Sequence, residues 1–236
     1  IIINEDIDLG SAEYKPEGNL IIDLNGHTLK SSTSVINTLH DLTVKDTSES
    51  KTGSVINTGT GTSSYAIRAA KDITITGGNF SSGQAILASN SKEKHMFKIE
   101  GGNFTATNSS GFAFNVANYD VIIDSCTAVN PTASGGGVMK LSGTSDVDIK
   151  GGEFLSNSMA INNAGSGKIT IDGGVFKGST KGKPVLYLTS ADGSFIINNA
   201  EIINDSEDNP VAISAYKAAA GNIIINNGKI SGIISK

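Results

Sequence analysis

The chain of 236 residues has no tryptophan, one cysteine, four prolines and one arginine. The lone thiol of Cys126 excludes an intrachain disulfide, and a buried, unreactive side chain is its ordinary interpretation. Because Arg68 is the single arginine, bidentate clamps on phosphate or carboxylate groups are almost absent. These shortages argue against a disulfide-stabilised fold and against many sites that recognise phosphate.

Two further absences concern large partners. No apolar run approaches the roughly 18 residues of a membrane-spanning helix, so we expect no membrane insertion. The formal net charge of −5 argues against binding to nucleic acid, which normally requires a basic stripe. The chain begins at Ile1 and not at Met, which suggests a processed protein or an excised domain.

A phrase that returns with small changes dominates the sequence: an alternating apolar strand, two glycines, any residue and phenylalanine. It occurs at Ile73–Phe80, Phe97–Phe104, Val147–Phe154 and Ile169–Phe176. Glycine (28 residues), serine, threonine and asparagine are abundant, which is typical of short strands joined by tight turns. Repetition of this kind indicates a stacked repeat architecture.

The last apolar residue before each turn provides an anchor that can be followed along the chain. The anchors are Leu24, Val44, Ile75, Ile99, Ile123, Ile149, Ile171, Ile197 and Ile225. Their spacing varies from 20 residues (Leu24 to Val44) to 31 (Val44 to Ile75), which fits coils with loops of variable length. Alternation places the apolar side chains inside, and the glycine pair permits a sharp corner, with asparagine pairs replacing it at 198–199 and 226–227.

Each coil contains three apolar patches, and Phe80, Phe104, Phe154 and Phe176 are expected to stack behind the glycine corner. We therefore predict an all-β, single-domain, right-handed parallel β-helix of about nine coils with three short strands each. Residues 1–19 are expected to form an N-terminal capping strand, and residues 20–236 the coils. The longest interval contains a polar excursion over residues 45–51, which predicts a loop and an enlarged coil.

This pattern resembles the pectin-lyase-like right-handed β-helix superfamily over nearly the whole chain. The segment Ile22–Leu29 followed by Gly-Gly-x-Phe coils is similar to repeat regions of secreted or cell-surface bacterial proteins. The catalytic plans of that superfamily do not match, because Arg68 lacks the arginine-centred motif of the lyases. The hydrolase strings are also missing, and His27 lies in a predicted turn.

One group of outward positions remains a candidate site. Stacking the coils places Lys98 near five residues on one outer face: Glu100, Asp124, Asp148, Lys150 and Asp172. Such carboxylates could bind Ca²⁺ or act as an acid and base, with Lys150 as a possible base. Alternatively, Lys beside Glu or Asp merely relieves repulsion in a solvated ladder, and the alternating signs favour that interpretation.

Other candidates are weaker. Tyr187 and Tyr216 lie in or near the third strand, where tyrosines could stack on sugar rings. His40 and His95 lack a second ligand at metal-like spacing, so we predict no metal site through them and no required cofactor. Outward Ile196 and Ile224 should be covered by a loop or pack on a partner.

The sequence therefore favours a non-catalytic, secreted or cell-surface β-helix domain of adhesin-like or glycan-binding function. Its expected partners are a glycan, a host or cell-surface protein, or neighbouring domains of a longer chain. One alternative is a divergent polysaccharide lyase or glycoside hydrolase that uses the acidic and lysine face. Another is a structural spacer within a larger surface protein. A superfold hosts many functions, so the choice depends on a site.

Overall fold

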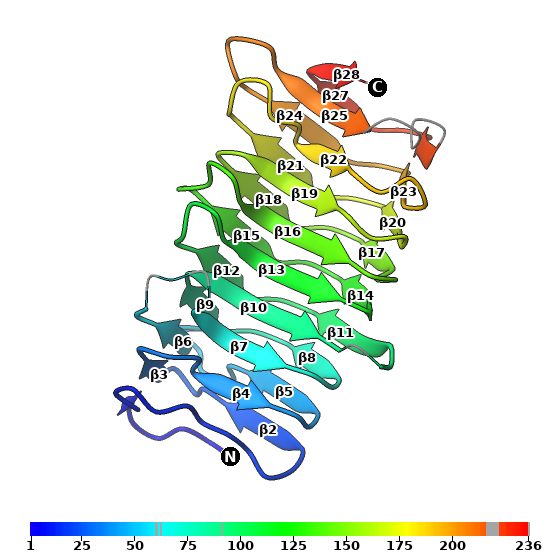
Figure 1. The fold of residues 1–236 in the computed structure, drawn as a ribbon. Coiled ribbons are helices and arrows are strands. Elements are labelled where there is room, and N and C mark those ends of the chain that lie inside the picture. Colours follow the sequence, from blue (N-terminus) through cyan, green and yellow to red (C-terminus); the bar gives the residue numbers. More distant parts are fainter. Residues whose placement is uncertain (60, 62, 91, 216–221, 236) are drawn as a thin grey trace.

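The computed structural model describes residues 1–59, 61, 63–90, 92–215 and 222–235. The described chain winds into a rod of about nine turns, and three parallel sheets run along its length (Figure 1). Each turn contributes one strand to each sheet, which we call sheets A, B and C. The prediction of an all-β parallel β-helix with three short strands per coil is confirmed.

The strands follow one another in the order A, B, C along the chain. Sheet A contains β2 (Leu20–Asp23), β5 (Leu42–Lys45), β8 (Ile73–Ile75), β11 (His95–Ile99), β14 (Tyr119–Ile123), β17 (Val147–Ile149), β20 (Lys168–Ile171), β23 (Ser194–Ile197) and β26 (Ile223–Ile225). Sheet B contains β1 (Ile7–Asp8), β3 (Thr28–Ser31), β6 (Ser54–Asn57), β9 (Asn79–Ser82), β12 (Asn103–Ala106), β15 (Thr127–Asn130), β18 (Glu153–Ser156), β21 (Val175–Gly178), β24 (Glu201–Asn204) and β27 (Lys229–Ser231). Sheet C contains β4 (Ile36–Thr38), β7 (Tyr65–Ala69), β10 (Gln84–Ser89), β13 (Phe112–Ala117), β16 (Gly137–Ser142), β19 (Met159–Asn163), β22 (Leu186–Leu188), β25 (Val211–Ala215) and β28 (Ile233–Ser235).

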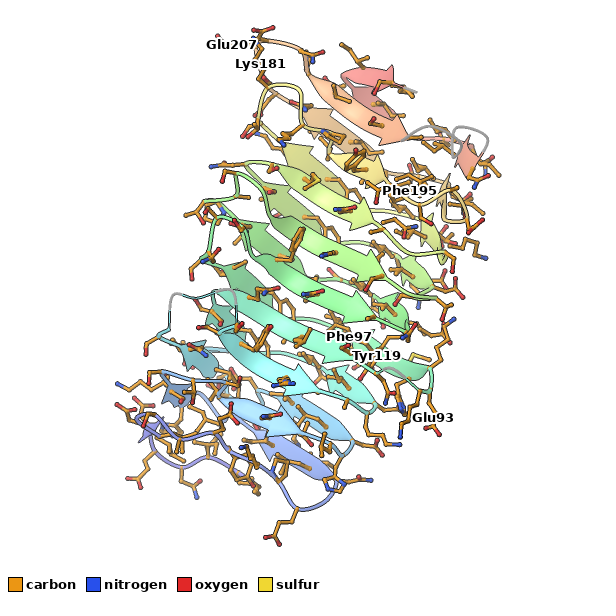
Figure 2. The ribbon with its side chains drawn as sticks, in the orientation of Figure 1. Glu93, Phe97, Tyr119, Lys181, Phe195 and Glu207 are labelled. Carbon is orange, nitrogen blue, oxygen red and sulfur yellow. The ribbon has the colours of Figure 1, made fainter. Side chains whose placement is uncertain are left out.

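The core is a continuous apolar interior enclosed by the three sheets. Ile73 and Ile75 of β8 are fully buried, whereas Thr74 between them is half-buried on the outer face. In Figure 2, Phe97, Tyr119 and Phe195 belong to this interior, while charged side chains such as Glu93 lie on the loops. Alternation along each strand thus separates core from surface, as the sequence pattern predicts.

Phenylalanines stack from turn to turn directly behind the corner between sheets A and B. The rings of Phe80 and Phe104 are 4.9 Å apart and nearly parallel, and those of Phe154 and Phe176 are 4.7 Å apart. These centroid distances are close to the spacing between neighbouring strands, so each ring covers the one in the next turn. The predicted phenylalanine stack is present as two pairs, because Ala128 occupies the row between Phe104 and Phe154.

Most corners have a glycine of positive φ at the second position. Gly102 has a φ of +115°, and a methyl group there would lie 3.0 Å from the carbonyl oxygen of Gly78. The prediction that asparagine pairs replace the glycines is wrong by one position, because Ala200 occupies the second position and Asn198 the outward position before the corner. Ala200 does not adopt positive φ, so that corner forms without a left-handed residue.

The first nineteen residues, predicted as a capping strand, join all three sheets. Ile2 forms a single bridge with Asp23, β1 pairs with β3, and Tyr14 forms a bridge with Ile36. The segment is therefore an abbreviated turn that follows the same path as the turns after it. Within the described ranges no helix is long and apolar enough to cross a membrane.

The register of β2 differs from the sequence-based alignment. Ile22, and not Leu24, pairs with Val44, which places Asp23 opposite Lys45. Asp23 is 4% exposed, although the sequence pattern placed it on the surface. Leu24 instead fills the corner, where it is fully buried. The longer run of apolar residues in this strand conceals which residue ends it.

The polar excursion over residues 45–51 folds back around one buried carboxylate. Asp46 is 5% exposed and accepts hydrogen bonds from the backbone nitrogens of Gly26 and Gly53 and from the hydroxyl of Ser48. Burial opposes ionisation, but these hydrogen bonds outweigh it and keep the pKa of Asp46 below its usual value. The expected loop is thus an ordered part of the rod.

Candidate functional site

The structure brings the predicted acidic face together on the outside of sheet A. Glu100, Asp124, Lys150 and Asp172 follow β11, β14, β17 and β20, one per turn, and we call them the acidic column. The backbone nitrogens of Asp124, Lys150 and Asp172 each donate to a carbonyl of the preceding turn at 2.8–2.9 Å. Asp148 lies on the neighbouring outward position of β17, between Ile122 and Thr170.

Ion pairs occupy most of the charged groups in this region. The ammonium of Lys150 lies 2.6 Å from a carboxylate oxygen of Asp124, and that of Lys98 lies 2.6 Å from Glu100. The hydrogen bond from Lys150 is the main reason that the pKa of Asp124 is lowered. The hydrogen bond to Glu100 likewise raises the pKa of Lys98. These are the features of a solvated ladder of opposite charges.

The remaining carboxylates of this region, Asp172 and Asp148, lack an ion-pair partner among the described residues. Asp172 accepts a hydrogen bond from the amide of Asn198 at 2.7 Å. Asp148 is exposed and makes no hydrogen bond or ion pair with the described residues. Among those residues, no three His, Cys, Asp or Glu side chains are grouped closely enough to hold a metal ion. Lys150 stands between Asp124 and Asp172, and Lys98 is paired with Glu100, so these carboxylates are not gathered as a Ca²⁺ site requires.

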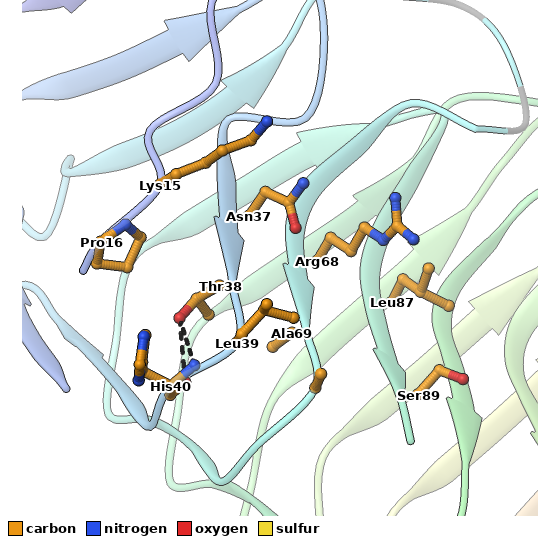
Figure 3. A pocket seen from close by; sticks show the side chains of 11 residues that line it. Lys15, Pro16, Asn37, Thr38, Leu39, His40, Arg68, Ala69, Leu87 and Ser89 are labelled. Carbon is orange, nitrogen blue, oxygen red and sulfur yellow. Dashed lines mark hydrogen bonds between the residues drawn. The ribbon is translucent and has the colours of Figure 1, made fainter. Parts of the chain in front are cut away.

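A groove of about 530 Å³ lies on the outer face of sheet C, near the N-terminal end of the rod (Figure 3). Its floor is formed by β4, β7 and β10, and Lys15 and Pro16 of the first turn form one wall. Leu39, which is 71% exposed, and Leu87 supply apolar surface. The groove therefore combines apolar patches with polar side chains, as small-molecule and sugar sites do.

Hydrogen bonds fix the wall and one end of this groove. Glu13 accepts from the amide of Asn37 at 2.9 Å and lies 3.0 Å from the ammonium of Lys15. The hydrogen bond from Asn37 is the main reason that the pKa of Glu13 is lowered. The hydroxyl of Thr38 donates to the carbonyl of His40 and accepts from its backbone nitrogen. The first turn is thereby held against β4.

The groove carries positive charge without a carboxylate in its lining. Arg68 projects from the exposed outer position of β7, between Asn37 and Leu87 in the register, and Figure 3 shows it beside Leu87. Its guanidinium makes no ion pair or hydrogen bond with the described residues. Lys140, three strands further along the same face, is also without a partner there. The described part of sheet C thus presents two cations without a partner, in a chain of net charge −5.

Of the two predicted tyrosines, only Tyr187 is among the described residues. Tyr187 is half-buried on β22 and lies between Asn162 and Ser214 in the register, on the same face as the groove. Tyr216 lies outside the described residues. Between Leu87 and Tyr187 the row contains, in order, Asn115, Lys140 and Asn162. This row of polar side chains continues the groove along the rod.

The groove is a site that the sequence pattern did not reveal. In the sequence, Arg68 stands out only as the single arginine. No lyase motif surrounds it, so the sequence did not mark it as a site residue. The available signal was its place in an outward row without acidic neighbours, which requires the register of sheet C. Lys15 comes from the first turn, and its position beside β4 depends on contacts between turns.

No match was found for this chain among protein-family models, curated proteins or solved structures.

Proposed function

We propose that this chain is a non-catalytic β-helix domain, secreted or displayed at a cell surface, that binds a glycan along the outer face of sheet C. The observation that carries the proposal is the guanidinium of Arg68, which has no partner among the described residues and lies beside a groove with apolar patches and no carboxylate in its described lining. Asn37, Ser89 and Lys15 supply hydrogen-bonding groups around it. Polar groups that converge on an apolar surface suit the mixed faces of a sugar.

The charge of the groove favours an acidic saccharide over a neutral one. A free guanidinium can donate two parallel hydrogen bonds to a carboxylate or sulfate, and Lys140 offers a second cation along the face. Tyr187 extends the same face with an aromatic ring on which a sugar could stack. The ligand would then lie along the rod and contact one outward row of side chains in successive turns.

A binding role agrees better with these features than a catalytic one. Glycosidases require two carboxyl groups across the scissile bond, and the groove lining contains none. In the acidic column, Asp124 and Lys150 are held by each other. We further propose that the chain is related to the pectin-lyase-like β-helices and to bacterial surface repeats. Its partner would then lie on a host or cell surface. No cofactor is needed for such binding.

The test is a panel of neutral, carboxylated and sulfated oligosaccharides, with binding measured by calorimetry. We expect an acidic member to bind and Arg68→Ala to weaken it about tenfold, as the loss of a charged hydrogen bond would. Arg68→Lys should recover only part of the affinity, because the planar fork is lost. Lys150→Ala removes an exposed cation from sheet A and serves as the matched control.

Two results would contradict the proposal. One is the absence of binding to every saccharide in the panel. The other is an equal loss of affinity in Arg68→Ala and Lys150→Ala, which would indicate a general effect of net charge.

A further inference from the structure

Sheet C differs from the other two sheets in its charged residues. Its described strands contain no Asp or Glu, and their only charged residues are Arg68 on β7 and Lys140 on β16. Sheets A and B carry both signs, as Asp148 and Lys168 show on β17 and β20. On β18 and β21 of sheet B, Glu153 and Lys177 do the same. The charge on the strands of sheet C is therefore of one sign and is concentrated at two points.

The two cations belong to one row of outward side chains. In the register of sheet C, Arg68 is followed by Leu87, Asn115 and Lys140. These residues lie on β7, β10, β13 and β16, which are consecutive strands of the sheet (Figure 1). Neighbouring strands are about 4.8 Å apart, so three steps separate the positions of the two cations by about 14 Å. The sheet thus fixes the distance between two sites for an anionic group.

The two positions between the cations suit neutral parts of a ligand. Leu87 is half-buried and offers apolar surface, over which an anion would lose hydration without gaining a partner. The amide of Asn115 donates to Oε1 of Gln84 at 3.1 Å, and its Oδ1 accepts no hydrogen bond from the described residues. A sugar hydroxyl can donate to that oxygen, whereas an ionised carboxylate or sulfate cannot.

The surroundings of the row add no further cation. The neighbouring outward row on the same strands consists of small, uncharged side chains: Ser89, Ala117 and Ser142. At the first-turn end of the groove, the ammonium of Lys15 lies 3.0 Å from the carboxylate of Glu13, which compensates its charge. A third anion placed between the two cations would therefore find no partner on the described strands of this face.

We propose that sheet C recognises a sparsely charged acidic glycan, in which two anionic groups lie about 14 Å apart with neutral sugar units between them. This inference rests on the proposed function and specifies the ligand class of the same site. Arg68 binds one anionic group and Lys140 the other, while the neutral units lie over Leu87 and Asn115. A densely charged polymer places anions over those two residues, and this mismatch selects against it.

A set of linear hexasaccharides tests the proposal. They are β-1,4-linked glucose chains with two units carboxylated at C6, and none, one or two unmodified units separate the carboxylates. A further member is carboxylated on every unit. An extended chain of this kind advances by about one strand spacing per unit, so two unmodified units fit the separation of Arg68 and Lys140. A parallel series carries sulfate esters in place of the carboxylates.

Binding is measured by calorimetry at one fixed ionic strength. We expect the isomer with two unmodified units between its carboxylates to bind at least about tenfold more tightly than the isomer with adjacent carboxylates. The fully carboxylated chain should bind no more tightly than that isomer, despite its higher charge. The sulfate series should rank in the same order, because the spacing of the cations sets the preference.

Exchanging two residues of the row moves the second cation by one strand. Asn115→Lys combined with Lys140→Asn keeps the net charge and brings the two cations to about 10 Å, two strand spacings. The preferred isomer should then be the one with a single unmodified unit between its carboxylates. Lys140→Ala should abolish the preference, so that the isomers bind within about threefold of one another. Thermal melts verify that the variants fold.

Lys150→Ala is the matched control, because it removes an exposed cation from sheet A and should leave the order of the isomers unchanged. Acidic saccharides that bind equally well at every spacing overturn this inference and leave the proposed function intact. An exchange variant that keeps the original preference also overturns it. Absence of binding to every member of both series contradicts the proposed function itself, and the spacing preference with it.

Discussion

The carboxylate of Asp46 lies 2.7 Å from the backbone nitrogen of Gly53, seven residues further along the chain. A methyl group on Gly53 would lie 2.7 Å from the carboxylate carbon of Asp46 and 2.6 Å from the β-carbon of Leu24. The enlarged coil therefore closes over its buried carboxylate only because position 53 has no side chain.

Gly53→Ala is expected to destabilise the protein by about 1–3 kcal/mol, the usual cost of overpacking a well-filled interior. Urea denaturation followed by circular dichroism measures the change in the free energy of unfolding. Gly18→Ala is the matched control, since a methyl group at Gly18 would meet no atom within 4 Å. Equal stability of the two variants would mean that the 46–53 loop adapts freely.

Stability should fall in acid because of Asp23 and Asp46. Burial disfavours both carboxylates, but hydrogen bonds outweigh it and lower the pKa of each from 3.8 in the folded state. A carboxylate whose pKa is lowered by folding stabilises the protein at pH values above its pKa in the unfolded state. This contribution is lost as the pH falls from about 4 through the pKa of the folded state. Thermal melts between pH 2 and pH 7 should show this acid limb.

Asp46→Asn should flatten the acid limb and lower stability at neutral pH by about 1.5–3 kcal/mol, the range for hydrogen bonds to a charged group. Asp148→Asn serves as control, because Asp148 is exposed and has no partner among the described residues. An unchanged acid limb in Asp46→Asn would assign the pH dependence to other groups.

Cys126 is expected to be chemically inert in the folded protein. It is 5% exposed, and burial raises the pKa of its thiol to about 12. A thiol-specific reagent at pH 8 should therefore react at least about a hundredfold more slowly than with an exposed thiol. Ser125→Cys in a Cys126→Ala background supplies that exposed thiol at the neighbouring position. Fast labelling of Cys126 without denaturant would contradict its placement.

Asp124→Ala and Lys150→Ala should each change stability by less than about 1 kcal/mol, as is usual for exposed ion pairs. Neither variant should alter saccharide binding, because both residues lie on sheet A. A polysaccharide panel assayed for new reducing ends and for unsaturated uronate absorbance provides the catalytic readout. Cleavage by the unmodified chain that disappears in both variants would establish the enzymatic alternative.

Much of the fold could be predicted because one pattern repeats in nearly every turn. Phe104 and its equivalents mark the corner, and the alternation around Ile73 and Ile75 assigns inside and outside without further information. The errors arose where the pattern is weakest. The apolar run Leu20–Ile22, with Leu24 after Asp23, obscured the register, and an alanine at position 200 concealed the corner.

The acidic column could be placed on one face from the sequence, but its ion pairs could not. Whether Lys150 contacts Asp124 or another neighbour depends on side-chain conformation and on the offset between turns. The groove was beyond reach for a different reason. It forms where the first turn packs beside β4 and close to Arg68, and Lys15 and Arg68 are separated by more than fifty residues in the sequence.

In the proposed binding mode, the row of outward side chains from Arg68 through Lys140 to Tyr187 would also determine the length of the ligand. Each turn advances the row by one strand spacing, about 4.8 Å, and no smaller step is compatible with the hydrogen-bonded sheets. Duplication or deletion of a whole turn between Arg68 and Tyr187 would therefore change the span of a bound polymer by one fixed increment. Evolution could change the length of the recognised ligand by adding or removing turns, while the contacts within each turn stay the same.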